Sequence, residues 1–310
     1  MTLVNNTSVF LLYYFCIMKT LLVSDLHVDT YFDYAVKPSR LKSVDPAADV
    51  VYDTLDYIWN EYCIPFTDAI VIAGDISNDF LTFERTVDWL AKKYKKVYIV
   101  LGNHDIVVRG ATCSKSNNIF TCSEEKIIAM TNSCRRYYNV FLLENDIIDD
   151  IAGCMGMCDF KCDVMPYSLD PKFMWSKDWF DGQHWNYFGN NPERLCEHYE
   201  KVLDKFTKRR PRMIVTHFAP YELGIPKHYL NNQWNFAFYF KAEKFLDKFE
   251  HETYWLCGHT HDRRSVDYVN SKGQTVHIIC NPLGYPQDSN DIKIVKTARN
   301  TIMQKFVIDF

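Results

Sequence analysis

The sequence lacks the features that mark several large classes of protein. Its eleven cysteines include no CxxC pair, and an odd number cannot all be paired within one chain, which favours a reducing compartment over a disulfide framework. The chain also contains no internal repeat, no low-complexity tract and no Gly/Ser-rich linker. With 310 residues, 47% of them hydrophobic, it has enough apolar material for one large core. We therefore expect a single compact domain in the cytoplasm.

A membrane-spanning segment is also missing from the sequence. The apolar run Val9–Met18 is shorter than the roughly 20 helical residues that cross a bilayer. No charged residue precedes it, whereas a secretory signal begins with basic residues. We expect no membrane partner. We interpret residues 1–17 as an N-terminal extension that need not be native, with Met18 as an alternative start, and assign residues 18–310 to the domain.

An excess of positive charge is absent as well. The formal net charge is −4 at pH 7, so the chain as a whole gives no reason to expect tight binding to long nucleic acid, which depends on contacts between cations and phosphates. A nucleic-acid partner is left open by this argument but is not indicated. The oligomeric state is open too.

Strands and helices are expected to alternate along the chain. Short apolar runs predict buried strands at residues 21–23, 69–72, 97–100, 213–215 and 254–256. Helical periodicity lies between them, at about residues 46–62, 81–95, 122–138, 192–209 and 236–250. This order predicts a layered α/β fold whose ligand-binding loops follow the strands.

Residues 155–191 form a long connection without clear periodicity. Connections of this length are often lids or binding loops, although large aromatic side chains also commonly pack a satellite core, and both readings stay open here. The aromatic residues of this insertion are Trp175, Trp179, Phe180, Trp185, Tyr187 and Phe188.

Polar residues that can bind metal ions follow all five predicted strands directly. In Asp25-Leu26-His27, a carboxylate and an imidazole two residues apart point the same way if the backbone stays extended. The two imidazoles of His259 and His261 have the same spacing. Each cluster alone is a weak signal, but the ends of neighbouring strands meet, so together they predict one site. The five clusters are Ser24-Asp25-Leu26-His27, Gly74-Asp75, Gly102-Asn103-His104-Asp105, Thr216-His217 and Gly258-His259-Thr260-His261.

This ordered set of motifs resembles the complete signature of the calcineurin-like metallophosphoesterases, from about residue 19 to about residue 285. The resemblance implies an α/β fold built as a four-layer α/β/β/α sandwich with two central mixed sheets. It also implies two metal ions bridged by Asp75. One ion would be held by Asp25, His27 and His261, and the other by Asn103, His217 and His259.

The resemblance further implies hydrolysis of a phosphoester by a hydroxide that the two ions share. His104, not a ligand, would stabilise the transition state or protonate the leaving group, and Asp105 would orient His104 or another group near the metals. A mixed His/Asp/Asn ligand set suits Mn, Fe, Zn, Co or Ni better than Mg or Ca. We expect Mn or Fe.

The residues around the motifs narrow the substrate class. The sequence Ile76-Ser77-Asn78 follows Gly-Asp, where protein Ser/Thr phosphatases have Asp-Arg-Gly and purple acid phosphatases supply a tyrosinate ligand. The chain is more similar to the group that contains cyclic-nucleotide phosphodiesterases, small phosphodiesterases and some nucleases. We expect a small phosphodiester, or a phosphomonoester, of nucleotide type.

Within this substrate class, the aromatic insertion could stack a nucleobase, and Arg263 and Arg264 could contact a second phosphate or a ribose. One alternative is a DNA or RNA nuclease of the same superfamily. Another is a non-catalytic scaffold with the same fold, which the presence of all the motif residues disfavours.

Overall fold

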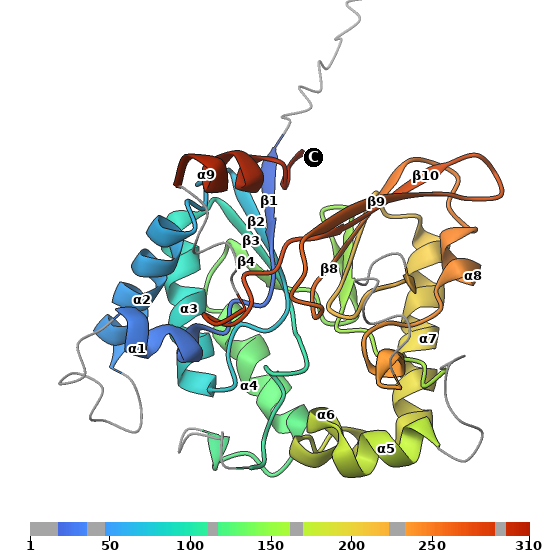
Figure 1. Cartoon of the computed structure of the whole chain (residues 1–310), viewed down its shortest axis with the longest axis horizontal. Helices are drawn as coiled ribbons and strands as arrows, with labels where there is room; N and C mark the ends of the chain where they lie inside the picture. Colours follow the sequence, from blue (N-terminus) through green and yellow to red (C-terminus); the bar gives the residue numbers. More distant parts are fainter. Residues whose placement is uncertain (1–17, 36–46, 111–116, 162–169, 223–232, 289–295) are drawn as a thin grey trace, which may run out of the picture.

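The computed structural model describes residues 18–35, 47–110, 117–161, 170–222, 233–288 and 296–310. Two β-sheets face each other between layers of helices (Figure 1). The first sheet consists, in spatial order, of β11 (Val307–Asp309), β1 (Lys19–Val23), β2 (Ala69–Ala73), β3 (Lys96–Val100) and β4 (Val140–Leu142). The second consists of β5 (Asp146–Ile148), β6 (Ile151–Cys154), β7 (Met213–Thr216), β8 (Thr253–Cys257), β10 (Thr275–Cys280) and β9 (Arg264–Val269).

The central strands of both sheets are parallel and apolar. All five residues of β2 are buried, as expected for a strand that is covered on both faces. Strands β1 to β4 run parallel and β11 pairs with β1 in the antiparallel sense. In the second sheet β6, β7, β8 and β10 are parallel, with antiparallel β5 and β9 at the edges. The carboxyl ends of β1, β2 and β3 therefore meet at one edge of their sheet.

Helices cover the outer face of each sheet (Figure 1). Helices α2, α3 and α4 lie against the first sheet, and α7 and α8 lie against the second. In α7, buried Leu195, Tyr199 and Phe206 form one apolar stripe, and Asn191 caps the helix by accepting from the backbone N–H of Arg194. The helices are α1 (Phe32–Ala35), α2 (Ala48–Glu61), α3 (Phe80–Lys93), α4 (Ser123–Cys134), α5 (Pro171–Asp178), α6 (Phe180–His184), α7 (Pro192–Arg209), α8 (Glu243–Leu246) and α9 (Lys296–Gln304), with 3-10 turns at Val28–Tyr31, Phe188–Asn190 and Asn235–Ala237.

The predicted fold of two mixed sheets flanked by helices is confirmed. The helix predicted at about residues 236–250 is wrong, because only the 3-10 turn Asn235–Ala237 and the one-turn α8 form there. Between them the backbone turns to pair with another segment: Phe240 N–H donates to the carbonyl of Ala219, and Ala242 N–H to that of Pro220. The prediction failed because the buried aromatic residues of this extended segment are spaced as they would be in a helix.

Two of the sequence predictions fall on segments that are not described. The N-terminal extension, residues 1–17, lies outside the described residues, and so does the part of the aromatic insertion at residues 162–169. Among the described helices, none has the length and apolar character needed to cross a membrane.

Candidate metal centre

The chain turns abruptly where the motif residues leave their strands. Asp25, His27, Asp75, His259 and His261 all have positive φ angles, of 53°, 40°, 58°, 72° and 50°. The expectation of an extended backbone at these motifs is therefore wrong. The left-handed conformation is unfavourable for residues other than glycine and persists only where the surroundings hold it, as functional sites often do. Here the residues in this conformation are among those whose side chains converge in two groups.

The glycines of the motifs leave room for these side chains. Gly74 has a φ of 89°, and a Cβ atom there would collide with the ring of His217. A Cβ on Gly102 would collide with the carboxylate of Asp75. The Gly-Asp and Gly-Asn pairs in the sequence thus reflect close packing of backbone against the polar side chains.

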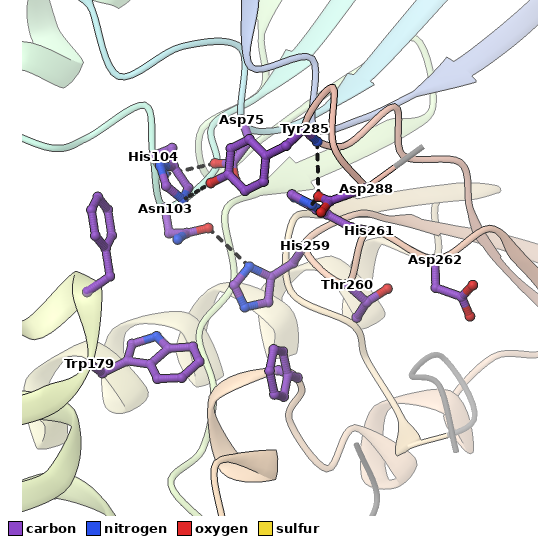
Figure 2. A pocket seen from close by; sticks show the side chains of 12 residues that line it. Asp75, Asn103, His104, Trp179, His259, Thr260, His261, Asp262, Tyr285 and Asp288 are labelled. Carbon is purple, nitrogen blue, oxygen red and sulfur yellow. Dashed lines mark hydrogen bonds and ion pairs between the residues drawn. The ribbon is translucent and has the colours of Figure 1, made fainter. Parts of the chain in front are cut away.

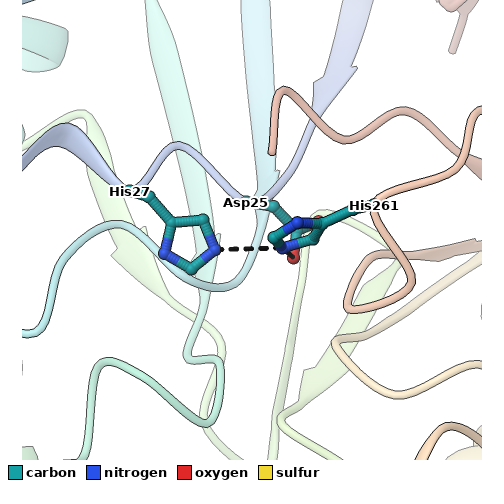
Figure 3. Close-up of side chains that lie close together, drawn as sticks. All are labelled: Asp25, His27 and His261. Atoms are coloured by element: carbon teal, nitrogen blue, oxygen red, sulfur yellow. Dashed lines mark hydrogen bonds and ion pairs between the residues drawn. The ribbon is translucent and has the colours of Figure 1, made fainter. Parts of the chain in front are cut away.

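Asp25, His27 and His261 form a first group of converging side chains (Figure 3). The Nε2 atoms of His27 and His261 lie 3.1 Å apart, and the Asp25 Oδ1 lies 3.5 Å from His261 Nε2. On the far side of its ring, His261 Nδ1 lies 2.6 Å from a carboxylate oxygen of Asp288. Because this carboxylate accepts the Nδ1 proton, the Nε2 atom of His261 faces the group.

Asp75, His217 and His259 form a second group, joined by Asn103. His217 Nδ1 donates to the backbone carbonyl of Ala73 at 2.8 Å, so its Nε2 atom faces the Asn103 Oδ1 at 2.8 Å and the Asp75 Oδ2 at 3.3 Å. The two oxygens are acceptors, and a buried space in which acceptors meet needs a positive charge, either a proton on His217 Nε2 or a bound cation.

His259 repeats this arrangement. Its Nε2 donates to the backbone carbonyl of Ala237 at 3.0 Å, which leaves the Nδ1 lone pair 3.1 Å from the Asn103 Oδ1 (Figure 2). Asp75 lies between the two groups, since its Oδ2 is 3.3 Å from His217 Nε2 and 3.7 Å from His27 Nε2. The donor set of two imidazole-carboxylate groups that share Asp75 fits two divalent cations.

The electrostatics of the groups also fit bound cations. Burial lowers the pKa of His259 to about 3 and holds the pKa of His27 well below its usual value, which keeps both rings neutral, as metal ligation requires. Burial acts in the same sense on His217, but the Asp75 carboxylate outweighs it and raises the pKa of His217 to about 10. Carboxylates likewise outweigh burial at His261, whose pKa rises to about 9. Without a metal ion, His217 and His261 thus carry protons at the positions where a bound cation would replace them.

His104 stands at the edge of these groups with its ring held in place. Its Nδ1 lies 2.8 Å from the Asn78 Oδ1, an acceptor, so Nδ1 carries the proton and Nε2 faces outward toward the hydroxyl of Tyr285 at 3.2 Å. The ring of Phe180 stacks on the imidazole with centroids 4.6 Å apart. Asn78 and Tyr285 were not predicted as site residues, and the only sequence signal was the place of Asn78 three residues after Asp75.

One of the two expected roles of Asp105 was to orient His104. In the structure its carboxylate makes other contacts. Its two oxygens accept the backbone N–H groups of Gly102, Asp75, Ile76 and Ser77 at 2.8 to 3.0 Å. This carboxylate ties the loop after β2 to the loop after β3. The orienting partner of His104 is Asn78.

A cavity of about 530 Å³ opens over both groups (Figure 2). Both aromatic and polar side chains line it. The aromatic residues are Trp179, Phe180, Phe238 and Tyr285, and the remaining lining residues are Asp75, Asn103, His104, His259, Thr260, His261, Asp262 and Asp288.

The order and geometry of the motifs agree with a known family. The sequence profile of the calcineurin-like phosphoesterases matches residues 18–263, most of the chain. The chain belongs to the calcineurin-like phosphoesterase family. It is accordingly a metal-dependent hydrolase of phosphoric esters, with two candidate metal-binding groups in its described residues.

A solved structure shares the fold of this phosphoesterase. The crystal structure of the phosphopantetheinyl hydrolase PptH from Mycobacterium tuberculosis is similar over 90% of this chain and 93% of that chain, with a TM-score of 0.62 and 13% sequence identity. At this identity the similarity concerns the fold alone. No curated protein sequence matches the chain.

Two predicted substrate contacts of the phosphoesterase lie apart from the cavity lining. Arg263 donates from Nε to the Asn281 Oδ1 at 2.9 Å, and Arg264 donates to the Asp262 Oδ2 at 3.2 Å. Neither arginine is among the described residues that line the cavity. The seven predicted metal ligands and His104, by contrast, are brought together.

Proposed function

We propose that this phosphoesterase hydrolyses the phosphodiester bond of a small, nucleotide-type substrate with two divalent transition-metal ions. The observation that carries the proposal is the convergence of imidazole nitrogens and carboxylate oxygens in two groups that share Asp75. The proposed ligands are Asp25, His27, Asp75, Asn103, His217, His259 and His261.

The ligand set favours certain metals. Each group combines imidazole nitrogen with carboxylate or amide oxygen, a mixture that suits Mn, Fe, Zn, Co or Ni better than Mg or Ca. We propose Mn or Fe as the native pair. Two such ions supply Lewis acidity toward the phosphate oxygens and lower the pKa of a bound water molecule.

His104 is proposed to act on the leaving group. Asn78 and Phe180 fix the plane of the imidazole, and its Nε2 atom faces the cavity. In the protonated state this atom can donate a proton to a leaving alkoxide, or a hydrogen bond to the transition state. The proton would travel to the ester oxygen as the bond between oxygen and phosphorus breaks.

The cavity walls support a small substrate with a planar group. Trp179 and Phe238 offer aromatic faces on which a nucleobase can stack. Among the described lining residues there are three carboxylates, Asp75, Asp262 and Asp288, but no lysine or arginine. A polynucleotide needs cationic contacts along its backbone, so the lining favours a mononucleotide diester over the nuclease alternative.

A substrate panel tests this proposal. Purified protein with Mn²⁺ should hydrolyse bis(p-nitrophenyl) phosphate and cyclic mononucleotides faster than dinucleotides, single-stranded DNA or phosphomonoesters under identical conditions. Fastest cleavage of single-stranded DNA would support the nuclease alternative. Two bound ions without hydrolysis of any substrate would support a scaffold.

We also propose a cytoplasmic location for the enzyme. The eight cysteines within the described residues are all free thiols, which fits a reducing compartment. Fractionation of cells that express the chain at native level checks this, and recovery from the medium would contradict it.

A further inference from the structure

Asn103 differs from the carboxylate ligands because its side chain must be held in one of two orientations to bind a metal ion. A carboxylate offers two equivalent oxygens, but an amide offers one oxygen and one NH₂ group, and only the oxygen can bind a metal ion. A rotation of 180° would point the NH₂ group of Asn103 at His217 and His259. The orientation therefore decides whether Asn103 can contribute a ligand atom to the second group.

Asp181 is placed to fix this orientation. Its Oδ1 accepts a hydrogen bond from Asn103 Nδ2 at 2.9 Å, and the whole residue is buried in α6. A carboxylate accepts hydrogen bonds, so the NH₂ group of Asn103 has to face Asp181. The Asn103 Oδ1 then faces His217 Nε2 and His259 Nδ1.

The same segment also holds the backbone of Asn103. Trp185, directly after α6, donates from Nε1 to the carbonyl oxygen of Asn103 at 2.8 Å. The ligand is thus fixed at its main chain and at its side chain by two residues four positions apart in the aromatic insertion. Both contacts come from a segment about 80 residues away in sequence.

We propose that Asp181 is a positioning residue that orients the amide of Asn103 for metal binding. This inference rests on the proposed two-metal function. It makes the α6 segment part of the metal centre, in addition to its place at the cavity wall.

A merely structural role fits Asp181 poorly. Its second oxygen, Oδ2, is buried and has no hydrogen-bond partner among the described residues, an arrangement that is unfavourable for folding. The segment has other anchors, since Trp175 and Trp185 are fully buried and the carbonyl of His184 accepts from the N–H groups of Val108 and Arg109. We therefore expect Asp181→Ala to fold.

The test measures Mn²⁺ binding to the full chain after removal of metal, by calorimetry and by the electron paramagnetic resonance signal of coupled Mn²⁺ pairs. Wild-type protein should bind two ions. In Asp181→Ala, one ion should bind about 10- to 100-fold more weakly, while the other ion keeps its affinity. The signal of coupled Mn²⁺ pairs should therefore fade at limiting Mn²⁺.

Two further variants serve as controls. Asp181→Asn should retain binding, because its side-chain oxygen can still accept a hydrogen bond from Asn103. Asp178→Ala, at an exposed aspartate of α5, is the matched control.

A double variant separates orientation from other effects. In Asn103→Asp the new carboxylate would face that of Asp181, and binding of one ion should weaken. Adding Asp181→Ala to this variant should restore the affinity, because a carboxylate ligand needs no orienting partner. The change Asp181→Ala would thus weaken binding in the wild-type chain and strengthen it in the Asn103→Asp variant.

Three outcomes overturn the inference. Unchanged binding of both ions in Asp181→Ala would show that the amide needs no such partner. Equal loss of both ions together with a lower melting temperature would show a structural role. Failure of Asp181→Ala to rescue Asn103→Asp would also contradict it. If wild-type protein binds fewer than two ions, the proposed function fails first, and the inference fails with it.

Discussion

At the scale of single residues, the site depends on where the protons of its histidine rings lie. The carbonyls of Ala73 and Ala237 accept ring protons from His217 and His259, and Asp288 accepts one from His261. Each of these acceptors fixes a tautomer and directs the other ring nitrogen inward. The metal centre is therefore prepared by acceptors that a sequence motif does not contain.

His104 provides a test that separates chemistry from metal binding. Its Nε2 is not one of the atoms that converge in the two groups, so His104→Ala should keep both ions and lower kcat by about 10²- to 10⁴-fold, the usual effect of losing a general acid. Hydrolysis rate and metal content, measured on the same sample, check this. His277→Ala, at a partly exposed histidine of β10, is the control. Loss of an ion in His104→Ala would instead make His104 a ligand.

We predict that Glu144, which is not part of the metal centre, makes the stability of the fold depend on pH. Its Oε2 is buried without a hydrogen-bond partner among the described residues, and burial raises the pKa of its carboxyl from 4.5 to about 8. Between these values the folded chain binds more protons than the unfolded chain. The free energy of unfolding contributed by Glu144 therefore falls as pH rises from about 4.5 to about 8.

Glu144→Gln should remove this dependence, because a glutamine stays neutral at every pH. Urea unfolding at pH 5 and pH 8 should show the variant gaining stability relative to wild type as pH rises. The pH dependence of metal binding is common to both proteins and cancels in the comparison. Glu197→Gln, at an exposed position of α7, controls for the loss of a charge. A difference that stays constant between the two pH values would contradict the prediction.

At the scale of elements, the aromatic insertion packs a satellite core with some of its rings and lines the cavity with others. Trp175 and Trp185 are fully buried and pack edge to face, with ring centroids 5.8 Å apart. Trp179 and Phe180, a few residues away, line the cavity. The buried pair anchors the segment of α5 and α6 that places Trp179 and Phe180 at the cavity wall.

Trp179→Ala should weaken binding of a nucleotide substrate and leave the chemical step nearly unchanged. Stacking of a base on an aromatic ring contributes about 1–3 kcal/mol, which corresponds to a rise in KM of about 5- to 150-fold for a cyclic mononucleotide. Steady-state kinetics measure KM and kcat separately. Phe173→Ala, at an exposed aromatic residue of α5, should change neither. An equal fall in kcat at constant KM would place Trp179 in the chemistry.

At the scale of the whole molecule, the metal centre lies where the two sheets meet. Asp25, Asp75 and Asn103 follow β1, β2 and β3 of the first sheet, while His217 and His259 follow β7 and β8 of the second. Strand β3 contacts β6 across the interface between the sheets. Neither sheet alone holds a complete donor set, so packing of the two sheets assembles the site.

The sequence predicted the parts of this arrangement that follow from local patterns. Apolar runs such as 69–72 marked the strands, and the polar residues directly after them marked the site. The left-handed turn at Asp25 was missed because long-range packing imposes it against local preference. Asn78, Asp181 and Asp288 were missed because their roles depend on contacts with distant residues.

The most direct test of the two-ion account is a titration of metal-free protein with Mn²⁺ during hydrolysis of bis(p-nitrophenyl) phosphate. We predict that the rate rises mainly with the second equivalent of Mn²⁺. Asp75→Asn should bind fewer than two ions and lose most of the activity, because Asp75 is the side chain that reaches both groups. Full activity at one equivalent, or full activity in Asp75→Asn, would contradict the two-metal centre.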